Sequence, residues 1–168
     1  MDTSTGLMGR TGFAEAAAAT FGKASAGGLP LSAVLIDVDH LKMLNEEHGS
    51  ECGDLILAHV SRLIGLNIQP AVDLATRNAG AEFILLLPEA DHAWASTFAE
   101  RLRGTLSNRP IQYNSDLITI SASLGVAERL PGDRDVEAMI RRARGAMRDA
   151  KAGGRNLVGV ASHLSLAA

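Results

Sequence analysis

The stretch DLATRNAGAEFILLLP, residues 73–88, holds two apolar, β-prone segments on either side of a turn of small residues. The segments are Asp73–Arg77 and Glu82–Pro88, and residues 78–80 form the turn. Short β-prone runs joined by such a turn predict a β-hairpin. A tight turn between core strands holds its backbone and side chains rigidly at one edge of a sheet. We therefore expect function to be decided at this tip, beside Glu82.

Length, charge and cysteine content bound what the chain can be. Its 168 residues, 46% of them hydrophobic, suit one domain with its own core; we expect residues 1–168 to be a single domain excised from a longer protein. A formal net charge of −3 gives no attraction for nucleic acid or an anionic membrane surface. The single cysteine, Cys52, excludes an intrachain disulfide and suits a reducing compartment. The sequence has no apolar run of membrane-spanning length and no signal-peptide pattern, so we expect a cytoplasmic protein that inserts into no membrane. From its charge we expect that it binds no nucleic acid.

Helices and one central strand are expected before the hairpin. Thr11 can cap a first helix that ends near Gly27. The near-continuous apolar run Leu31–Asp39 predicts a central strand with acids at its carboxyl end, where open α/β sheets bind ligands. His40–Glu47 predicts a short helix, and Ser50 can cap the next one. The apolar stripe of that next helix is expected at Leu55, Ile56, Ala58, His59, Leu63 and Ile64.

Two more helices and two strands are expected after the hairpin. Asp91 opens one helix, and Asp135–Ala152 predicts another. Leu117–Ala127 alternates well enough to predict one long strand, and Asn156–Val160 predicts a last short one. The expected core faces of the helices are Ala95, Phe98, Ala99, Leu102 and Leu106, then Val136, Ile140, Ala143, Met147 and Ala150. Four arginines are expected on the solvated face of the second helix, with phosphate binding as the alternative: Arg141, Arg142, Arg144 and Arg148.

The predicted order is helix, strand, helix, helix, hairpin, helix, strand, helix, strand. This order favours an α/β (α+β) fold in which helices flank a mixed central sheet of about five strands. Ferredoxin-like and nucleotidyl-cyclase folds have this arrangement. The hairpin of residues 73–88 is expected to belong to the sheet.

Paired acids stand at the end of the expected central strand. Asp37 and Asp39 are two residues apart, so their side chains share one face unless the strand has already turned into the loop. Such a pair suits Mg²⁺, which takes oxygen ligands and leaves room for phosphate oxygens. The strand-to-helix junction that follows offers free backbone N–H groups for a phosphate, and Lys42 adds a positive charge. The alternative is that these acids only end a strand and cap a helix.

Two further pairs have the chemistry of a nucleotide site. Lys151 and Arg155 bracket a glycine turn and could reach outer phosphates. Cations at a helix C-terminus are also favoured by the helix dipole alone. Asn45 and Asp54 together offer a carbonyl, amide donors and a carboxylate, which match the Watson–Crick edge of guanine. Taken alone, both would pass as ordinary surface residues.

Spaced motifs along nearly the whole chain resemble the GGDEF family, the diguanylate cyclase domains of bacterial cyclic di-GMP signalling. STGLMGR resembles the family's opening LTGLxNR, LIDVDHLKMLNEEHGSECGD its DIDxFKxxNDxxGHxxGD, and AKAGGRNLV its AKxxGRNxV. The resemblance implies a GTP site in which Asp37 and the Val38 carbonyl hold Mg²⁺, or Mn²⁺ in its place. It implies that Asn45 and Asp54 contact guanine. The implied phosphate and substrate contacts are His40, Leu41, Lys42, Gly80, Lys151 and Arg155.

The signature motif departs from the family pattern. Where the family reads GGDEF or GGEEF, residues 79–83 read AGAEF. The third position is an acidic metal ligand in active members, so Ala81 removes a carboxylate from the metal site. Glu82 is the acid that remains, and we assign it to the metal and to catalysis, although neighbours on a strand point to opposite faces. Of the family's optional inhibitory RxxD motif, Pro70 replaces the Arg and Asp73 keeps the Asp.

The leading hypothesis is a degenerate GGDEF domain that binds GTP, with weakened Mg²⁺ binding and lost or strongly impaired cyclase activity, and that serves as a regulatory module. Expected partners are GTP or cyclic di-GMP, a second copy of the chain, or a covalently linked sensory or phosphodiesterase domain. One alternative is an active diguanylate cyclase that condenses two GTP molecules, favoured by Asp37, Glu82, Lys151 and Arg155. A further alternative is a dimerising scaffold that binds no nucleotide.

Overall fold

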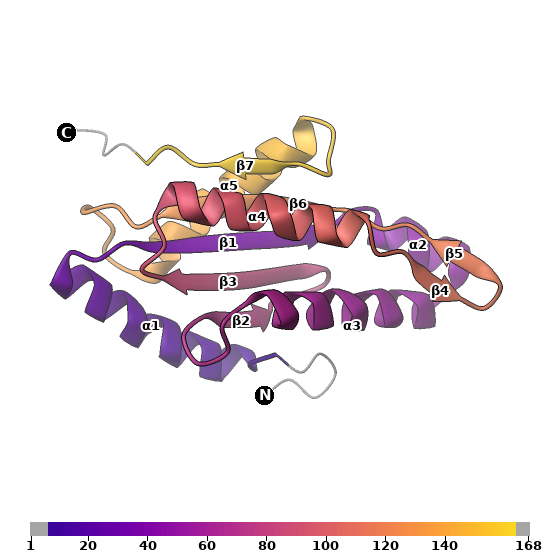
Figure 1. Cartoon of the computed structure of the whole chain (residues 1–168), viewed down its shortest axis with the longest axis horizontal. Coiled ribbons are helices and arrows are strands. Elements are labelled where there is room, and N and C mark those ends of the chain that lie inside the picture. Colours follow the sequence, from indigo (N-terminus) through magenta and orange to yellow (C-terminus); the bar gives the residue numbers. More distant parts are fainter. Residues whose placement is uncertain (1–6, 164–168) are drawn as a thin grey trace.

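The computed structural model describes residues 7–163 of the chain (Figure 1). Residues 4–6 of the opening motif lie outside this range. The helices are α1 (Arg10–Gly27), α2 (Leu41–His48), α3 (Ser50–Asn67), α4 (His92–Ser107) and α5 (Val136–Ala152). The strands are β1 (Leu31–Val38), β2 (Leu74–Arg77), β3 (Glu82–Pro88), β4 (Ile111–Tyr113), β5 (Asp116–Ile118), β6 (Ala122–Glu128) and β7 (Val158–Val160).

Strand β1 lies at the centre of a five-stranded sheet with the order β2-β3-β1-β6-β7. It pairs antiparallel with β3 on one side and with β6 on the other, while β7 runs parallel to β6. Residues 31–36 of β1 are all buried, as expected for a central strand covered on both faces. Strands β2 and β3 form the predicted hairpin. The predicted mixed sheet of about five strands is therefore confirmed.

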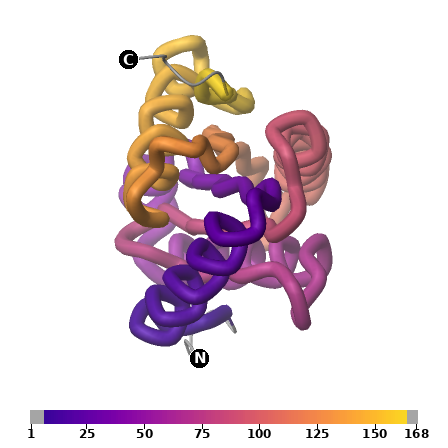
Figure 2. The backbone as a smooth tube through the Cα atoms, turned by 90° about the vertical axis from the view of Figure 1, so that its left-hand side faces the viewer, coloured from indigo at the N-terminus to yellow at the C-terminus, as the bar shows by residue number. Residues whose placement is uncertain are grey.

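Helices cover both faces of the sheet, as the view along the strands shows (Figure 2). Leu31, Ala33 and Leu35 of β1 pack in a cluster with side chains of α1 and α5. Val34 and Ile36, which alternate with them, pack in a second cluster with side chains of α3 and α4. The period-two alternation of β1 thus divides the core into two layers.

Glycines on β6 and β7 bring helix α5 close to the sheet. A Cβ atom on Gly125 would lie 1.9 Å from the carbonyl oxygen of Ala143, and one on Gly159 would lie 2.1 Å from that of Ala146. Both distances are far below van der Waals contact, so no larger residue fits at either position with α5 where it is. This close approach sets how near the side chains of α5 come to the end of β1.

The prediction of one long strand over Leu117–Ala127 is wrong. The segment is divided between β5 and β6, with residues 119–121 outside both. Strand β5 turns away to form a separate two-stranded hairpin with β4. Ile118, Ile120 and Ala122 are nevertheless all buried. The apolar alternation therefore continues across residues 119–121, and for this reason the break between the two strands could not be predicted from the sequence.

Two helix caps also differ from the prediction. Helix α1 starts at Arg10 after Gly9, so Thr11 lies inside the helix and is not its cap. Helix α3 starts at Ser50 after Gly49, whose φ of 95° favours glycine. The acidic caps were predicted correctly, since Asp91 accepts a hydrogen bond from the Trp94 N–H at 2.8 Å and Asp135 caps α5 in the same way.

The predicted core faces of α4 and α5 are confirmed in full, but the stripe of α3 is shifted. Leu55 is 41% exposed and Ala58 is also exposed. Their places in the core are taken by Cys52, Leu57 and Val60. The buried apolar residues of α3 are Cys52, Ile56, Leu57, Val60, Leu63 and Ile64.

The first described residues join the edge of the sheet. Met8 and Thr76 form an isolated parallel bridge, in which the Met8 N–H donates to the Ala75 carbonyl at 3.2 Å. The Thr76 hydroxyl donates back to the Met8 carbonyl at 2.7 Å. The backbone before α1 is thereby bound to β2, one strand of the hairpin.

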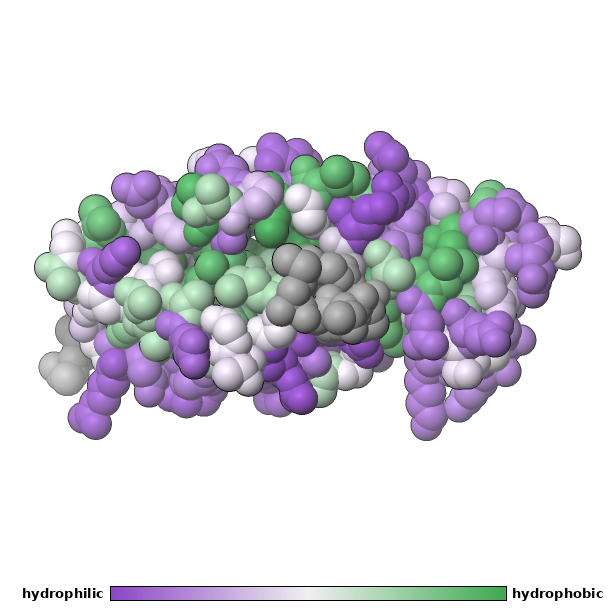
Figure 3. All heavy atoms as spheres, turned by 90° about the horizontal axis from the view of Figure 1, so that it is seen from below, coloured by the Kyte–Doolittle hydropathy of each residue, from purple (hydrophilic) through white to green (hydrophobic). Residues whose placement is uncertain are grey.

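Exposed apolar side chains are scattered over the surface. Leu66 on α3, Trp94 on α4 and Leu117 on β5 are 70%, 49% and 65% exposed. On the face seen in Figure 3, apolar patches are interrupted by polar side chains. Isolated exposures of this kind are common on folded proteins. Among residues 7–163, no helix combines the length and the apolar character that a membrane crossing requires.

Candidate active site

The candidate site lies at the carboxyl end of β1, beside the tip of the β2–β3 hairpin. Asp37 is directly opposite Glu82 of β3 in the strand register and opposite Ser123 of β6 on its other side. The Val38 N–H donates to the Ala81 carbonyl at 3.2 Å. The signature turn and the acid-bearing end of β1 are therefore hydrogen-bonded to each other, and this contact joins two elements that the sequence predicted separately.

Asp39 has a structural role that the sequence analysis missed. It is only 3% exposed, and its carboxylate accepts hydrogen bonds from the hydroxyls of Ser121 and Ser123, both at 2.7 Å. A further bond comes from the Asn156 N–H at 3.1 Å. These three bonds satisfy the carboxylate, and through them Asp39 links β1 to β6 and to the turn after α5. The only hint in the sequence was the pair of serines two residues apart, Ser121 and Ser123, whose hydroxyls can donate to a buried acid.

Asp37 is paired with a cation from α5. The ammonium group of Lys151 contacts the Asp37 carboxylate. Burial, together with the charge of the neighbouring Arg155, lowers the pKa of Lys151. Lys151 was expected at a phosphate, and the structure places it against the acid expected to hold the metal.

Glu82 is paired with a second cation from α5. Arg144 donates to its carboxylate at 2.7 Å, and the side-chain amide of Asn78 donates to it at 2.8 Å. The hydrogen bond from Arg144 to Glu82 raises the pKa of the guanidinium group. Arg144 was expected on a solvated helix face, and this expectation is wrong. Because α5 lies so close to the sheet, the arginine reaches the hairpin instead.

Ala81 and Glu82 lie on opposite faces of the hairpin. Ala81 lines an open cavity of about 430 Å³ together with side chains of α2 and the start of α3. Glu82 points the other way, toward α5. The alternation expected of neighbouring strand residues is present here. The lining residues of this cavity are Leu41, Lys42, Asn45, Glu46, Ser50 and Ala81.

This cavity gathers part of the predicted substrate set. Leu41, Lys42 and Asn45 line it together. The Asn45 side chain lies against Gly53 of α3, where a Cβ would come within 1.9 Å of Asn45 Oδ1. That oxygen is buried and has no hydrogen-bond partner among the described residues. Asp54 follows Gly53 on α3 and is exposed, outside the lining of the cavity.

The remaining predicted phosphate and substrate contacts, His40, Arg155 and Gly80, lie at three turns. His40 is exposed and precedes α2 in the left-handed region, with φ 58°. Arg155 is also exposed and left-handed, with φ 64°, and its N–H caps α5 by donating to the Ala150 carbonyl at 3.1 Å. Gly80, at the hairpin tip, has φ 61° and accepts a hydrogen bond from Arg77.

The acids present do not form a divalent-metal site. Among residues 7–163, no three His, Cys, Asp or Glu side chains are placed so that they could hold a metal ion together. Asp37 and Glu82 each contact a cation of α5, and Ala81 has no ligand atom in its side chain. The residues therefore do not fit the metal site that the resemblance implies.

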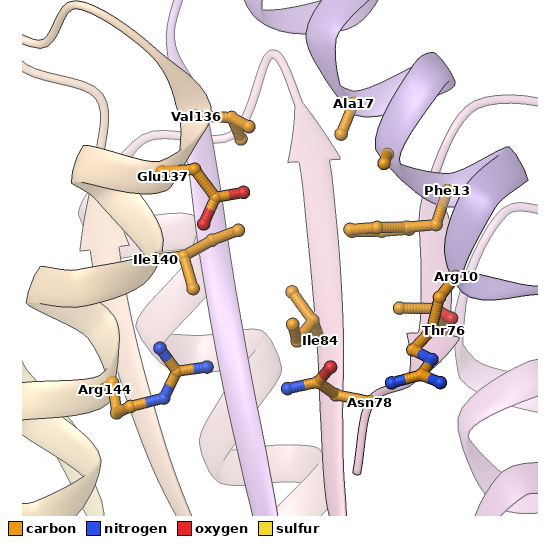
Figure 4. A pocket seen from close by; sticks show the side chains of 11 residues that line it. Arg10, Phe13, Ala17, Thr76, Asn78, Ile84, Val136, Glu137, Ile140 and Arg144 are labelled. Carbon is orange, nitrogen blue, oxygen red and sulfur yellow. The ribbon is translucent and has the colours of Figure 1, made fainter.

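A second, smaller cavity of about 200 Å³ lies on the Glu82 side of the hairpin, between α1 and α5. Figure 4 shows its apolar walls, which include Phe13, Ile84 and Ile140. The two side chains that hold Glu82, Asn78 and Arg144, also line this cavity. The hairpin tip thus separates two cavities, one against α2 and one against α5.

Comparison with known proteins identifies relatives along almost the whole chain. The family model described as "Diguanylate cyclase, GGDEF domain" matches residues 1–157. The response regulator PleD of Caulobacter vibrioides is 33% identical over 159 residues, which cover 94% of this chain and 35% of PleD. The chain thus spans about a third of the length of this curated relative.

Solved structures of similar sequence share the fold. The GGDEF domain of DgcB from Caulobacter crescentus, solved with c-di-GMP, superposes with a TM-score of 0.90 at 30% identity, covering 95% of this chain and 92% of that one. Diguanylate cyclase SiaD from Pseudomonas aeruginosa, solved with its activator SiaC, gives 0.89 at 29% identity, covering 95% of this chain and 61% of that one. The architecture described above is therefore that of these domains.

Proposed function

Because the chain belongs to the GGDEF family of diguanylate cyclase domains, we propose that it is a regulatory domain of cyclic di-GMP signalling that binds GTP and has lost most or all cyclase activity. The observation that carries the proposal is the cavity against α2. It retains Lys42 and Asn45 but has Ala81 at the third signature position.

The Asn45 side chain supports guanine as the base. Its buried Oδ1 lacks a donor among the described residues, and guanine N1–H and N2–H₂ are donors. Gly53 leaves the space that the Asn45 amide occupies. Asp54, exposed on the same helix, would accept a second bond from the base.

The phosphates would be bound by groups from two elements. Lys42 and the backbone N–H groups at the start of α2 are on one side, and Lys151 and Arg155 are on the other. Binding would draw Lys151 away from Asp37, so part of the gain is lost to the acid left behind. GTP affinity should therefore be modest.

The proposed loss of cyclase activity follows from the missing acid at position 81 and from the state of the acids that remain. The GGDEF family uses GTP and a divalent metal, whereas here Ala81 offers no ligand and the two remaining acids, Asp37 and Glu82, are paired with cations. Removal of a metal ligand that stabilises developing charge commonly reduces the rate about a thousandfold. Glu82 does not replace the missing acid, because Arg144 and Asn78 already hold its carboxylate.

The regulatory role is proposed from the relatives. PleD is a response regulator about three times as long as this chain, and SiaD was solved with an activator protein. We place the domain in the cytoplasm beside a covalent sensory or phosphodiesterase neighbour, or in a homodimer, where it responds to GTP or cyclic di-GMP.

The first test is a calorimetric titration of the chain with GTP, in EDTA and again with excess Mg²⁺. We expect binding in both, with dissociation constants that differ by less than about tenfold. Asn45→Ala should weaken binding by about tenfold or more, because it removes a polar partner of the base. No heat of binding in either buffer contradicts the proposal, and a steep requirement for Mg²⁺ contradicts its metal part.

The second candidate is a working cyclase, favoured by the retained acids Asp37 and Glu82 opposite each other in the sheet. The concentrated chain is incubated overnight with GTP and Mg²⁺ or Mn²⁺ beside an Ala81→Asp variant, and nucleotides are separated by anion exchange. We expect no cyclic di-GMP from the unmodified chain. Product at ordinary cyclase rates would establish the second candidate and overturn the loss of activity.

A further inference from the structure

Helix α5 presents two cations to the two acids of the site. Arg144 and Lys151 are seven residues apart, which is about two helical turns, so they lie on nearly the same face. The acids they contact, Asp37 and Glu82, are directly opposite each other in the β1–β3 register. Two neighbouring carboxylates are thus each paired with a cation from α5.

The contact of Arg144 is built into the fold. The side chains of Arg144 and Glu82 are 28% and 16% exposed, so both are largely withdrawn from water. Asn78 holds the same carboxylate oxygen as Arg144 and thereby fixes the acid from the hairpin side. Figure 4 shows Arg144 extending from α5 toward the side chain of Asn78, which lies below Ile84 in this view.

We propose that Arg144 is an internal counter-ion that occupies Glu82 and, independently of Ala81, prevents a divalent cation from binding at this edge of the sheet. The inference takes the site to be that of the proposed function. On this proposal two separate features of the chain prevent metal binding: Ala81 at the signature turn and Arg144 on α5.

The chemistry of arginine favours this reading over a transient contact. A guanidinium group stays charged at any physiological pH and fits a carboxylate with a planar fork of donors. A cation that approached Glu82 would have to displace this group and would also meet the charge of Lys151 beside it. An acid restored at position 81 supplies one ligand but leaves both obstacles in place.

The test is Mn²⁺ binding to the 168-residue chain, measured without nucleotide by the loss of the free-ion EPR signal. Three variants are compared: Ala81→Asp, Ala81→Asp with Arg144→Gln, and Ala81→Asp with Arg148→Gln. Arg148 is exposed on the same helix, so its replacement controls for the loss of one positive charge. We expect Mn²⁺ to bind at least tenfold more tightly to the Arg144 double variant than to the other two.

Equal Mn²⁺ affinity in Ala81→Asp and in the Arg144 double variant would overturn the inference. So would an equal gain from Arg148→Gln, since the effect would then be one of net charge. Ala81→Asp with Arg144→Met removes the same cation with an apolar side chain, and we expect it to bind Mn²⁺ as tightly as the Arg144→Gln double variant. This variant decides the matter if Arg144→Gln impairs folding, which thermal unfolding reports.

The outcome is independent of GTP. If the chain fails to bind GTP in EDTA, the proposed function fails, while the Mn²⁺ titration still shows whether Arg144 excludes the ion. If GTP binds and the variants take up Mn²⁺ alike, the proposed function stands and the counter-ion is refuted.

Discussion

Asp37 and Asp39 are two residues apart and equal in chemistry, yet they have different partners. Asp37 contacts a lysine at the edge of the site, whereas Asp39 is buried under hydroxyl and backbone donors. The spacing predicted that both would share one face of a strand, but β1 ends at Val38 and Asp39 lies beyond it. The spacing could not show which acid would be enclosed, because the donors come from β6 and from the turn after α5, more than 80 residues later.

Replacing Asp39 should therefore destabilise the protein more than replacing an exposed acid. Asp39→Asn exchanges an acceptor for an amide donor that faces other donors, and it should lower the free energy of unfolding by about 3 kcal/mol. Asp116→Asn is the control, since that side chain is 62% exposed and should change the value by less than about 0.5 kcal/mol. Urea unfolding measures both. Equal stability of the two variants would refute the buried role.

At the scale of the elements, helix α5 decides what the site contains. The sequence predicted its start at an acidic cap and its apolar face correctly, because caps and a 3.6-residue period are local signals. It did not predict that Arg144 would meet Glu82. That contact depends on how closely the helix approaches the sheet, which is set by glycines on two other strands.

The close approach can be tested at Gly125. Gly125→Ala places a Cβ 1.9 Å from the Ala143 carbonyl oxygen and 2.5 Å from the Met147 nitrogen, so α5 must move. We expect a loss of about 3 kcal/mol in the free energy of unfolding. Gly145→Ala, on α5 with nothing within 4 Å of the new atom, should instead add roughly 0.5–1 kcal/mol. A Gly125 variant as stable as the parent would mean that the helix lies further out.

At the scale of the whole molecule, the sequence predicted the layers and the sheet, and it erred where a chain segment leaves the sheet. Residues 119–121 keep the apolar alternation of a strand, although the residues before them, 116–118, pair with β4 outside the main sheet. Periodicity reports which side chains are buried, not which strand they pair with. For the same reason the stripe of α3 was displaced, since its flanking positions depend on where α4 and β4 pack.

The packing of α3 against the chain before β4 has a consequence for acid stability. His59 of α3 donates to the Arg109 carbonyl at 3.0 Å. Burial lowers the pKa of His59; the bond to Arg109 opposes this shift, and the charges of Arg62 and Arg109 add to it. The unfolded chain therefore takes up a proton at a higher pH than the folded protein does, and the free energy of unfolding should fall as the solution is acidified below about pH 6.5.

His59→Gln keeps a side-chain N–H donor but cannot titrate. Between about pH 7.5 and about pH 5.5 the parent should lose more of its unfolding free energy than this variant, as urea midpoints at the two pH values would show. Identical losses in the two proteins would exclude His59 as a source of the pH dependence.

The bridge between Met8 and Thr76 gives the fold a mechanical property. A pull on the backbone at Met8 acts on β2 through two hydrogen bonds in parallel, and Arg77, next along that strand, is bonded to the Gly80 carbonyl at the tip. The start of the described chain and the signature turn are therefore connected through β2 by these hydrogen bonds. A displacement of the backbone at Met8 would therefore reach the turn through β2, whose Ala75 and Thr76 are buried.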